Sequence, residues 1–152
     1  MRVLLIALLL AMTTSANANP LAAYRWQNRP LIVFAPASDD ARLAEQMRAL
    51  NDARAGLKDR DQVVLVVTSE GIEPALGPDP DGASAEAATA LRERFGIGPN
   101  DFAVILVGKD GTEKLRETEP LSTESLFGTI DAMPMRRREM REGTTGDTPR
   151  TR

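Results

Sequence analysis

The 152-residue chain contains neither cysteine nor histidine, and these two absences exclude several kinds of chemistry. Without a thiol, the chain cannot exchange disulfides or reduce a peroxide through cysteine. Without an imidazole, it has neither a Ser-His catalytic triad nor the ligands that zinc usually takes. Only a cation site made entirely of oxygen ligands would remain, so we expect no metal and no cofactor.

The first eighteen residues have the pattern of a secretory signal peptide. A basic start precedes an apolar run over residues 3–11, and Ala16-Asn17-Ala18 supplies the small residues that signal peptidase recognises. We therefore expect cleavage between Ala18 and Asn19, and a periplasmic or secreted product. A membrane-spanning helix needs about 20 apolar residues, roughly twice this run. An uncleaved anchor is the alternative; after cleavage no integral membrane anchor is expected. A cysteine-free exported chain also suits the oxidising bacterial periplasm.

Charge is distributed unevenly along the chain, whose net charge is −3. Six arginines against three acidic residues give residues 136–152 a charge of +3, which leaves residues 19–135 at −7. An acidic body argues against nucleic acid as a partner. The basic end has two open interpretations: it contacts an acidic protein or another anionic partner, or it is solvated. We expect disorder over residues 142–152, which have little to bury.

Four segments have the pattern of β-strands. Three are continuous apolar runs, typical of strands buried on both faces of a sheet, at residues 31–35, 62–68 and 102–107. The fourth, residues 113–117, follows a tight-turn signal and alternates in polarity, which predicts an antiparallel edge strand. Residues 69–83 are rich in proline, glycine and aspartate, so no lasting regular structure is expected there.

Helical patterns separate these strands. The first begins after Ser38-Asp39-Asp40, the second begins at Ser84 and stops at Gly96, and the last begins at Ser122 and is ended or kinked by Pro134. The resulting order, β-α-β-α-β-β-α, predicts an α/β thioredoxin-like three-layer sandwich over residues 19–141. Two parallel crossovers and a closing hairpin are expected within it.

Five segments together resemble the bacterial family called domain of unknown function 4174. They are LAAYRW at residues 21–26, NRPLIVFAP at 28–36, DRD at 59–61, VGKDG at 107–111 and IDAMPMR at 130–136. The resemblance covers roughly residues 21–141. Related domains occur in vertebrate extracellular matrix proteins, including sushi-repeat-containing ones. The resemblance implies a thioredoxin-like fold in an exported protein, and it assigns no activity and no catalytic position.

The turn after the first strand is where thioredoxin-like proteins carry their reactive group, because a helix N-terminus stabilises an anion there. In this chain the turn offers Ser38 and Asp39 as candidate ligand-binding residues. A nucleophilic Ser38 would need a lysine as its base, either Lys58, Lys109 or Lys114. We favour the simpler interpretation that the turn caps a helix.

Other charged residues are also candidates, each with a simpler interpretation. Arg60 lies between two aspartates just before a strand, which is typical of a local ion-pair network. Lys109 lies in a turn that lacks the remaining residues of a phosphate-binding loop. Asp79 and Asp81 are able to hold Ca²⁺ loosely, but their spacing does not match an EF-hand loop, and a solvated turn is the simpler interpretation.

Two further segments offer candidate binding surfaces. Tyr24 and Trp26 with Arg25 and Arg29 form either an aromatic and cationic surface or a segment packed onto the domain. The second segment combines adaptable methionines with arginines that bind carboxylates or phosphates. It either docks to a partner or packs with its arginines solvated; its members are Met133, Met135, Arg136, Arg137 and Arg138.

The function expected from the sequence is that of a binding or structural module. The alternative is a non-thiol enzyme or oxidoreductase-like remnant that uses Ser38, Asp39, Arg60 or Lys109. An enzyme would keep a concave pocket with converging polar groups at the first strand-helix turn. A docking module would instead expose an apolar patch beside the arginines.

Overall fold

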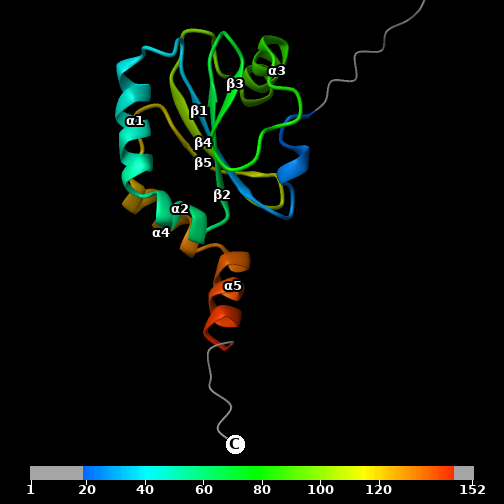
Figure 1. Ribbon diagram of the computed structural model, residues 1–152, viewed down its shortest axis with the longest axis vertical. Coiled ribbons are helices and arrows are strands. Elements are labelled where there is room, and N and C mark those ends of the chain that lie inside the picture. Colours follow the sequence, from blue (N-terminus) through cyan, green and yellow to red (C-terminus); the bar gives the residue numbers. More distant parts are fainter. Residues whose placement is uncertain (1–18, 146–152) are drawn as a thin grey trace, which may run out of the picture.

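The computed structural model describes residues 19–145 and contains a five-stranded mixed sheet with helices on both faces (Figure 1). The strand order is β3-β2-β1-β4-β5. The strands are β1 (Arg29–Phe34), β2 (Gln62–Val67), β3 (Ile72–Leu76), β4 (Ala103–Val107) and β5 (Glu113–Glu117). The helices are η1 (Ala22–Tyr24), α1 (Ala41–Asp52), α2 (Arg54–Asp59), α3 (Ala85–Phe95), α4 (Thr123–Asp131) and α5 (Pro134–Thr145).

Side chains of β1 alternate between two apolar cores, one on each face of the sheet. Leu31 and Val33 pack into the core under α1, α2 and α4. Ile32 and Phe34 pack into the core under α3 and the N-terminal segment. Because both faces are covered, the central strands are continuous apolar runs. The predicted three-layer α/β architecture is confirmed.

The predicted direction of one crossover is wrong. β1 pairs in parallel with β2, as expected, but it pairs antiparallel with β4. The reason is β3, a strand that the sequence pattern does not predict. β3 runs antiparallel to β2 and reverses the chain before α3, so the α3 connection delivers β4 antiparallel to β1.

β3 itself lies within residues 69–83, where no regular structure was expected. Its two ends, Ile72 and Leu76, are buried in the two cores, and this burial stabilises the strand. β3 tolerates Pro74 because it is an edge strand. On its outer side no neighbouring strand needs a hydrogen bond from the N–H that proline lacks.

Helix boundaries follow the predicted caps closely. The Ser84 and Ser122 side chains cap α3 and α4, and Gly96 ends α3 at a φ of 66°. The cap of α1 is Asp40, whose carboxylate accepts from the backbone of Arg42 and Leu43, so Ser38 itself lies in the turn before the helix.

The last predicted helix is two helices. α4 ends at Asp131, and Pro134 begins α5 instead of ending a helix, a position that suits proline because its missing N–H is not needed there. α5 extends away from the layered body (Figure 1). It continues to Thr145, four residues beyond the predicted end of the domain; residues 146–152 of the expected disordered tail lie outside the described residues.

Candidate functional site

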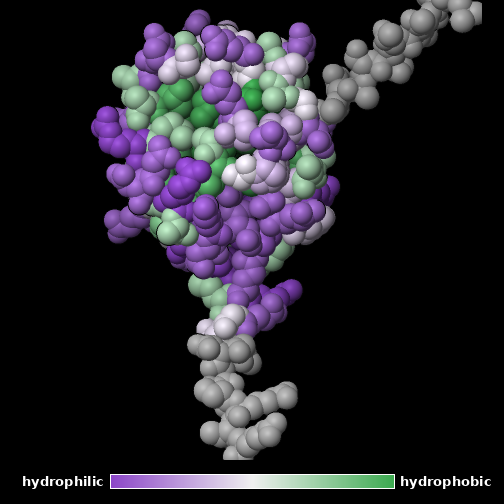
Figure 2. Space-filling view, in the orientation of Figure 1, coloured by the Kyte–Doolittle hydropathy of each residue, from purple (hydrophilic) through white to green (hydrophobic). Residues whose placement is uncertain are grey.

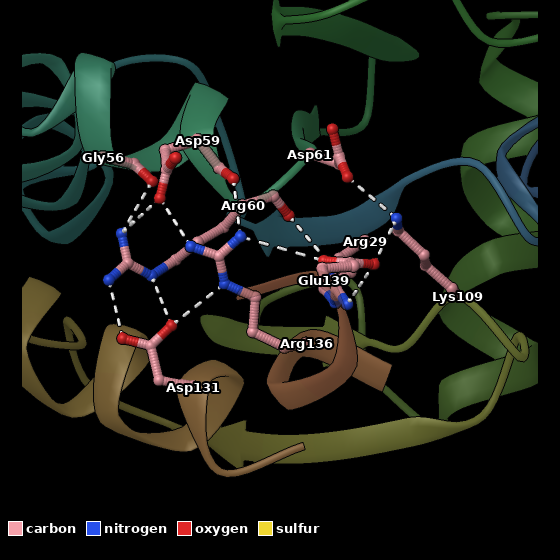
Figure 3. A network of polar contacts seen from close by, with 9 residues as sticks. All are labelled: Arg29, Gly56, Asp59, Arg60, Asp61, Lys109, Asp131, Arg136 and Glu139. Atoms are coloured by element: carbon pink, nitrogen blue, oxygen red, sulfur yellow. Dashed lines mark hydrogen bonds and ion pairs between the residues drawn. The ribbon is translucent and has the colours of Figure 1, made fainter. Parts of the chain in front are cut away.

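A network of ion pairs joins the N-terminal ends of β1 and β2 to α4 and α5 (Figure 3). Its innermost member is Arg29, whose side chain is 1 % exposed. The Arg29 guanidinium donates to both carboxylate oxygens of Glu139, at 3.1 and 3.2 Å, and to the Arg60 carbonyl oxygen at 3.0 Å. Glu139 on α5 is thereby bound to the first residue of the central strand.

Three further cations complete this network. Lys109 Nζ donates to Asp61 Oδ2 at 2.8 Å and to Glu139 Oε1 at 2.7 Å. Arg60 forms a two-point pair with Asp131, at 3.0 and 2.7 Å. Arg136 joins Asp59 on α2 to Asp131 on α4, at 2.5 and 3.3 Å. We call the eight residues the ion-pair network: Arg29, Asp59, Arg60, Asp61, Lys109, Asp131, Arg136 and Glu139.

The ion-pair network is electrically balanced, with four cations and four carboxylates. Burial raises the pKa of Glu139, but the hydrogen bonds from Lys109 and Arg29 lower it by more. The pKa of Glu139 therefore lies below its ordinary value. Hydrogen bonds from Arg60 likewise lower the pKa of Asp131. Each cation of the network lies within 4.0 Å of a carboxylate, and each carboxylate within 4.0 Å of a cation. The network fastens α5 to the domain.

The network changes the interpretation of several predicted residues. The predicted local ion pair is present, because Arg60 lies 3.8 Å from Asp59, but the shorter pairs of Arg60 and Lys109 are with Asp131 and Glu139, far along the chain. Arg136 is 8 % exposed, whereas Arg137 and Arg138 are exposed. The three arginines therefore form no common surface. Met133 packs against the core under α4, and Met135 is half-buried.

Ser38 and Asp39 lie at the opposite end of the sheet. Both are exposed in the turn between β1 and α1. The length of β1, about 17 Å at roughly 3.3 Å per residue, separates this turn from the ion-pair network. Ser38 thus has no access to Lys109 as a base, and the residues proposed for a non-thiol enzyme do not converge.

A buried arginine that the sequence pattern did not single out closes this end of the sheet. The Arg92 guanidinium is held by three backbone carbonyl oxygens, those of Ala35 at 2.5 Å, Gly98 at 2.8 Å and Val67 at 3.3 Å. Burial lowers the pKa of Arg92. Its position among Ala88, Leu91 and Phe95 on the apolar face of α3 is the signal that could have found it.

A groove of about 350 Å³ opens beside the same turn, between α1 and β3. Figure 2 shows apolar surface between these elements, in the middle of the viewed face. The polar lining groups are Ser38, Thr68 and Glu73, so the lining offers one carboxylate and no cation. Six of the nine lining residues are apolar: Leu43, Ala44, Met47, Val66, Pro74 and Ala75.

The N-terminal aromatic segment divides between the two predicted roles. Tyr24 is buried; its hydroxyl donates to the Pro78 carbonyl oxygen at 2.8 Å, and desolvation raises its pKa to about 12. Trp26 is 61 % exposed, with the Arg25 guanidinium 5.4 Å from its ring centre. Tyr24 therefore packs the N-terminal segment onto the domain, whereas Trp26 lies on the surface.

Two other features bear on function. Over residues 19–145, no three acidic side chains gather in a way that could hold a metal ion, and this includes Asp79 and Asp81. In the same part of the chain, no helix has the length and hydrophobicity needed to cross a membrane.

Comparison with known families identifies the domain. The family described as "Domain of unknown function (DUF4174)" matches residues 20–139. The chain belongs to the DUF4174 family. It is 30 % identical over 135 residues to coiled-coil domain-containing protein 80 of Danio rerio, a match that covers 80 % of this chain and 16 % of that protein. It is 26 % identical over 133 residues to sushi repeat-containing protein SRPX2 of Xenopus laevis, a match that covers 85 % of this chain and 29 % of that protein. This DUF4174 chain thus spans less than a third of the length of these relatives.

Solved structures place the DUF4174 domain in the thioredoxin-like class. The reduced 2-Cys peroxiredoxin of Plasmodium vivax superposes with a TM-score of 0.57 at 13 % identity, covering 78 % of this chain and 72 % of that one. Prx1a of Plasmodium yoelii gives 0.56 at 16 % identity, covering 78 % and 80 %. The predicted thioredoxin-like fold is confirmed. Since this chain contains no cysteine, the likeness extends to the fold and not to thiol chemistry.

Proposed function

We propose that this DUF4174 protein is an exported, non-redox binding module that holds an apolar polypeptide segment of a partner in the groove between α1 and β3. The observation that carries the proposal is the composition of that groove. It is open, it lies at the end of the sheet where related folds carry their reactive group, and two thirds of its lining residues are apolar. Ser38 lines this groove, whereas Lys109, a base that a nucleophilic Ser38 could use, lies at the opposite end of the sheet, which favours binding over catalysis.

The groove suits side chains better than an added β-strand. The Ile72 N–H of β3 already donates to the Ala83 carbonyl oxygen at 3.1 Å, and Pro74 has no N–H. An edge strand with these two donors unavailable is a poor template for strand addition. Met47, flexible and half-buried, is able to adapt to different apolar partners.

Charge indicates what flanks the apolar segment. Glu73 is exposed on the groove lining, and no arginine or lysine of the described residues lies within 4.0 Å of its carboxylate. A basic residue next to the apolar anchors would pair with Glu73. The expected ligand is therefore an apolar segment with an adjacent lysine or arginine.

Export to a bacterial periplasm, or secretion, is the second part of the proposal. It is supported by the signal-like residues 1–18 and by the absence of cysteine. N-terminal sequencing of the protein isolated from the periplasmic fraction is expected to begin at Asn19. A chain that begins at Met1 and stays in the cytoplasmic fraction would contradict this part alone.

The binding proposal is tested with the purified protein and a phage-displayed library of ten-residue peptides. We expect the selected peptides to share apolar residues next to lysine or arginine, and their affinity to fall at least about tenfold in Ala44→Lys, which places a charge in the groove. Ala44 is exposed on α1, so the fold should tolerate this substitution. Ala90→Lys, an exposed mid-helix alanine on α3, is the matched control and should bind normally. Equal affinity of both variants would refute the groove as the binding site.

A further inference from the structure

A second cavity lies on the other face of the sheet, between the N-terminal segment, the β4–β5 turn and the end of α3. Its volume is about 170 Å³. Asn19, Arg25 and Arg94 line it from the N-terminal segment and α3, and residues 108 and 110–112 line it from the β4–β5 turn. We infer that this cavity binds a small carboxylate anion with a short carbon chain. The inference is independent of the groove between α1 and β3.

Both arginines of the cavity lack an anionic partner. The Arg25 guanidinium lies over the Trp26 ring, and Arg94 donates to the Asn19 side-chain oxygen at 3.0 Å. Over residues 19–145, no carboxylate lies within 4.0 Å of either guanidinium. Every cation of the ion-pair network, by contrast, has its carboxylate. The cavity therefore has an excess of positive charge that an anion would balance.

Asp110 is the acidic residue of the cavity lining, and its carboxylate is already engaged. One oxygen accepts from the backbone and hydroxyl of Thr112, and the other pairs with Lys114 at 2.9 Å. The Lys114 and Thr112 hydrogen bonds outweigh burial and hold the pKa of Asp110 at about 2. Its negative charge is thus compensated by Lys114 and is not available to Arg25 or Arg94.

The cavity has defined walls. The Asn19 side-chain oxygen accepts from the Leu21 N–H at 3.1 Å as well as from Arg94, which fixes the N-terminal segment against α3. Gly111 lines the cavity without a side chain, and its φ of 81° lies in the left-handed region that favours glycine. A Cβ at that position would be 3.6 Å from Arg25 Nε, so the guanidinium end of Arg25 lies over the turn.

The size and the apolar part of the lining favour a carboxylate with a short carbon chain. The volume equals that of about six waters, which is too small for a polymer. Leu21, Ala22, Pro30 and Val107 also line the cavity and would contact carbon atoms, which phosphate lacks. A free carboxylic acid and the C-terminus of a peptide share this chemistry.

Trp26 makes the site observable, because it is the one tryptophan of the chain and adjoins Arg25. Its backbone is held in the left-handed region at a φ of 67°, and its N–H donates to the Lys109 carbonyl oxygen at 2.6 Å. A bulky exposed residue rarely adopts this conformation, and such strain accumulates at functional positions. Its fluorescence is expected to respond when an anion binds Arg25.

The test is a fluorescence titration of the purified protein with butyrate, N-acetylalanine, N-acetylalanine amide and inorganic phosphate, with calorimetry as a second readout. We expect saturable binding of both carboxylates and none of the amide. Tighter binding of butyrate would indicate a free carboxylic acid as the ligand, and tighter binding of N-acetylalanine would indicate the C-terminus of a peptide. Arg25→Gln with Arg94→Gln should weaken binding by about tenfold or more.

The matched control is Arg48→Gln with Arg54→Gln, which removes two arginines from the α1–α2 side of the domain and should leave affinity unchanged. Circular dichroism of both double variants checks that the fold is retained. The inference is overturned if no carboxylate binds saturably, if the amide or phosphate binds as well as the acids, or if the two double variants have the same affinity.

Discussion

Substitution of Glu139 by glutamine perturbs the centre of the ion-pair network. Glutamine keeps the shape of the side chain but removes the charge that Arg29 and Lys109 share. Arg29 is 1 % exposed and would keep one strong partner, the Arg60 carbonyl oxygen. Removing one partner of a buried ion pair usually lowers the free energy of unfolding by about 3–5 kcal/mol. Because Glu139 is 26 % exposed, water screens part of this interaction, and we expect a loss of about 2–3 kcal/mol.

The assay is urea unfolding followed by circular dichroism, combined with amide hydrogen exchange over α5. If α5 separates from the domain before the sheet unfolds, its amides should lose protection first. The matched control is Glu142→Gln, one turn further along α5 and exposed, which should change the free energy of unfolding by less than about 0.5 kcal/mol. Equal stability and equal α5 protection in the two variants would show that Glu139 does not hold α5 to the domain.

Three further predictions concern the pH dependence of Glu139, the packing of Gly56 and the hydrogen bonds of Gln46. The pKa of Glu139 is lowered in the folded protein, so its contribution to stability is complete above the ordinary pKa of 4.5 and is lost as pH falls through the folded value. The free energy of unfolding should therefore decline below about pH 4.5, and less steeply in Glu139→Gln; identical pH profiles would contradict this. Gly56→Ala should lower thermal stability, because a Cβ there would lie 2.7 Å from Phe127 Cε2, and overpacking costs about 1–3 kcal/mol. Gly128→Ala, with no atom within 4 Å of the new Cβ, should instead raise stability by up to about 1 kcal/mol; a shift of the same sign in both would be evidence against the overpacking. Gln46→Leu should reduce the free energy of unfolding by about 2–3 kcal/mol, measured in urea, because Gln46 pairs with both the N–H and the carbonyl oxygen of Leu121; wild-type stability would contradict it.

Features that local residues determine could be predicted from the sequence. The apolar runs of β1, β2 and β4 are continuous because both faces of the sheet are covered, so the composition of each run alone reveals a strand. Ser84 and Ser122 cap their helices through backbone groups three residues away, and Gly96 supplies a left-handed residue. Such short-range signals specify where elements begin and end.

Features that depend on distant partners could not be predicted. β3 has proline and flanking glycines that locally favour a turn, and it is a strand because β2 pairs with it. Because β3 was not predicted, the predicted direction of β4 was wrong. Arg136 looks no different in sequence from Arg137, yet Asp59 and Asp131 bury the first and not the second. The groove likewise joins residues of α1 with residues of β2 and β3, which no local pattern brings together.

The proposed function assigns partner binding to the groove between α1 and β3, at the opposite end of the sheet from the ion-pair network. The most direct test is a map of backbone amide chemical shifts upon addition of a library-selected peptide. We predict that the largest shifts fall on residues 43–47 of α1 and 72–76 of β3. Shifts centred on Arg60, Arg136 and Glu139 would contradict binding in the groove and assign the ion-pair network as the binding surface instead.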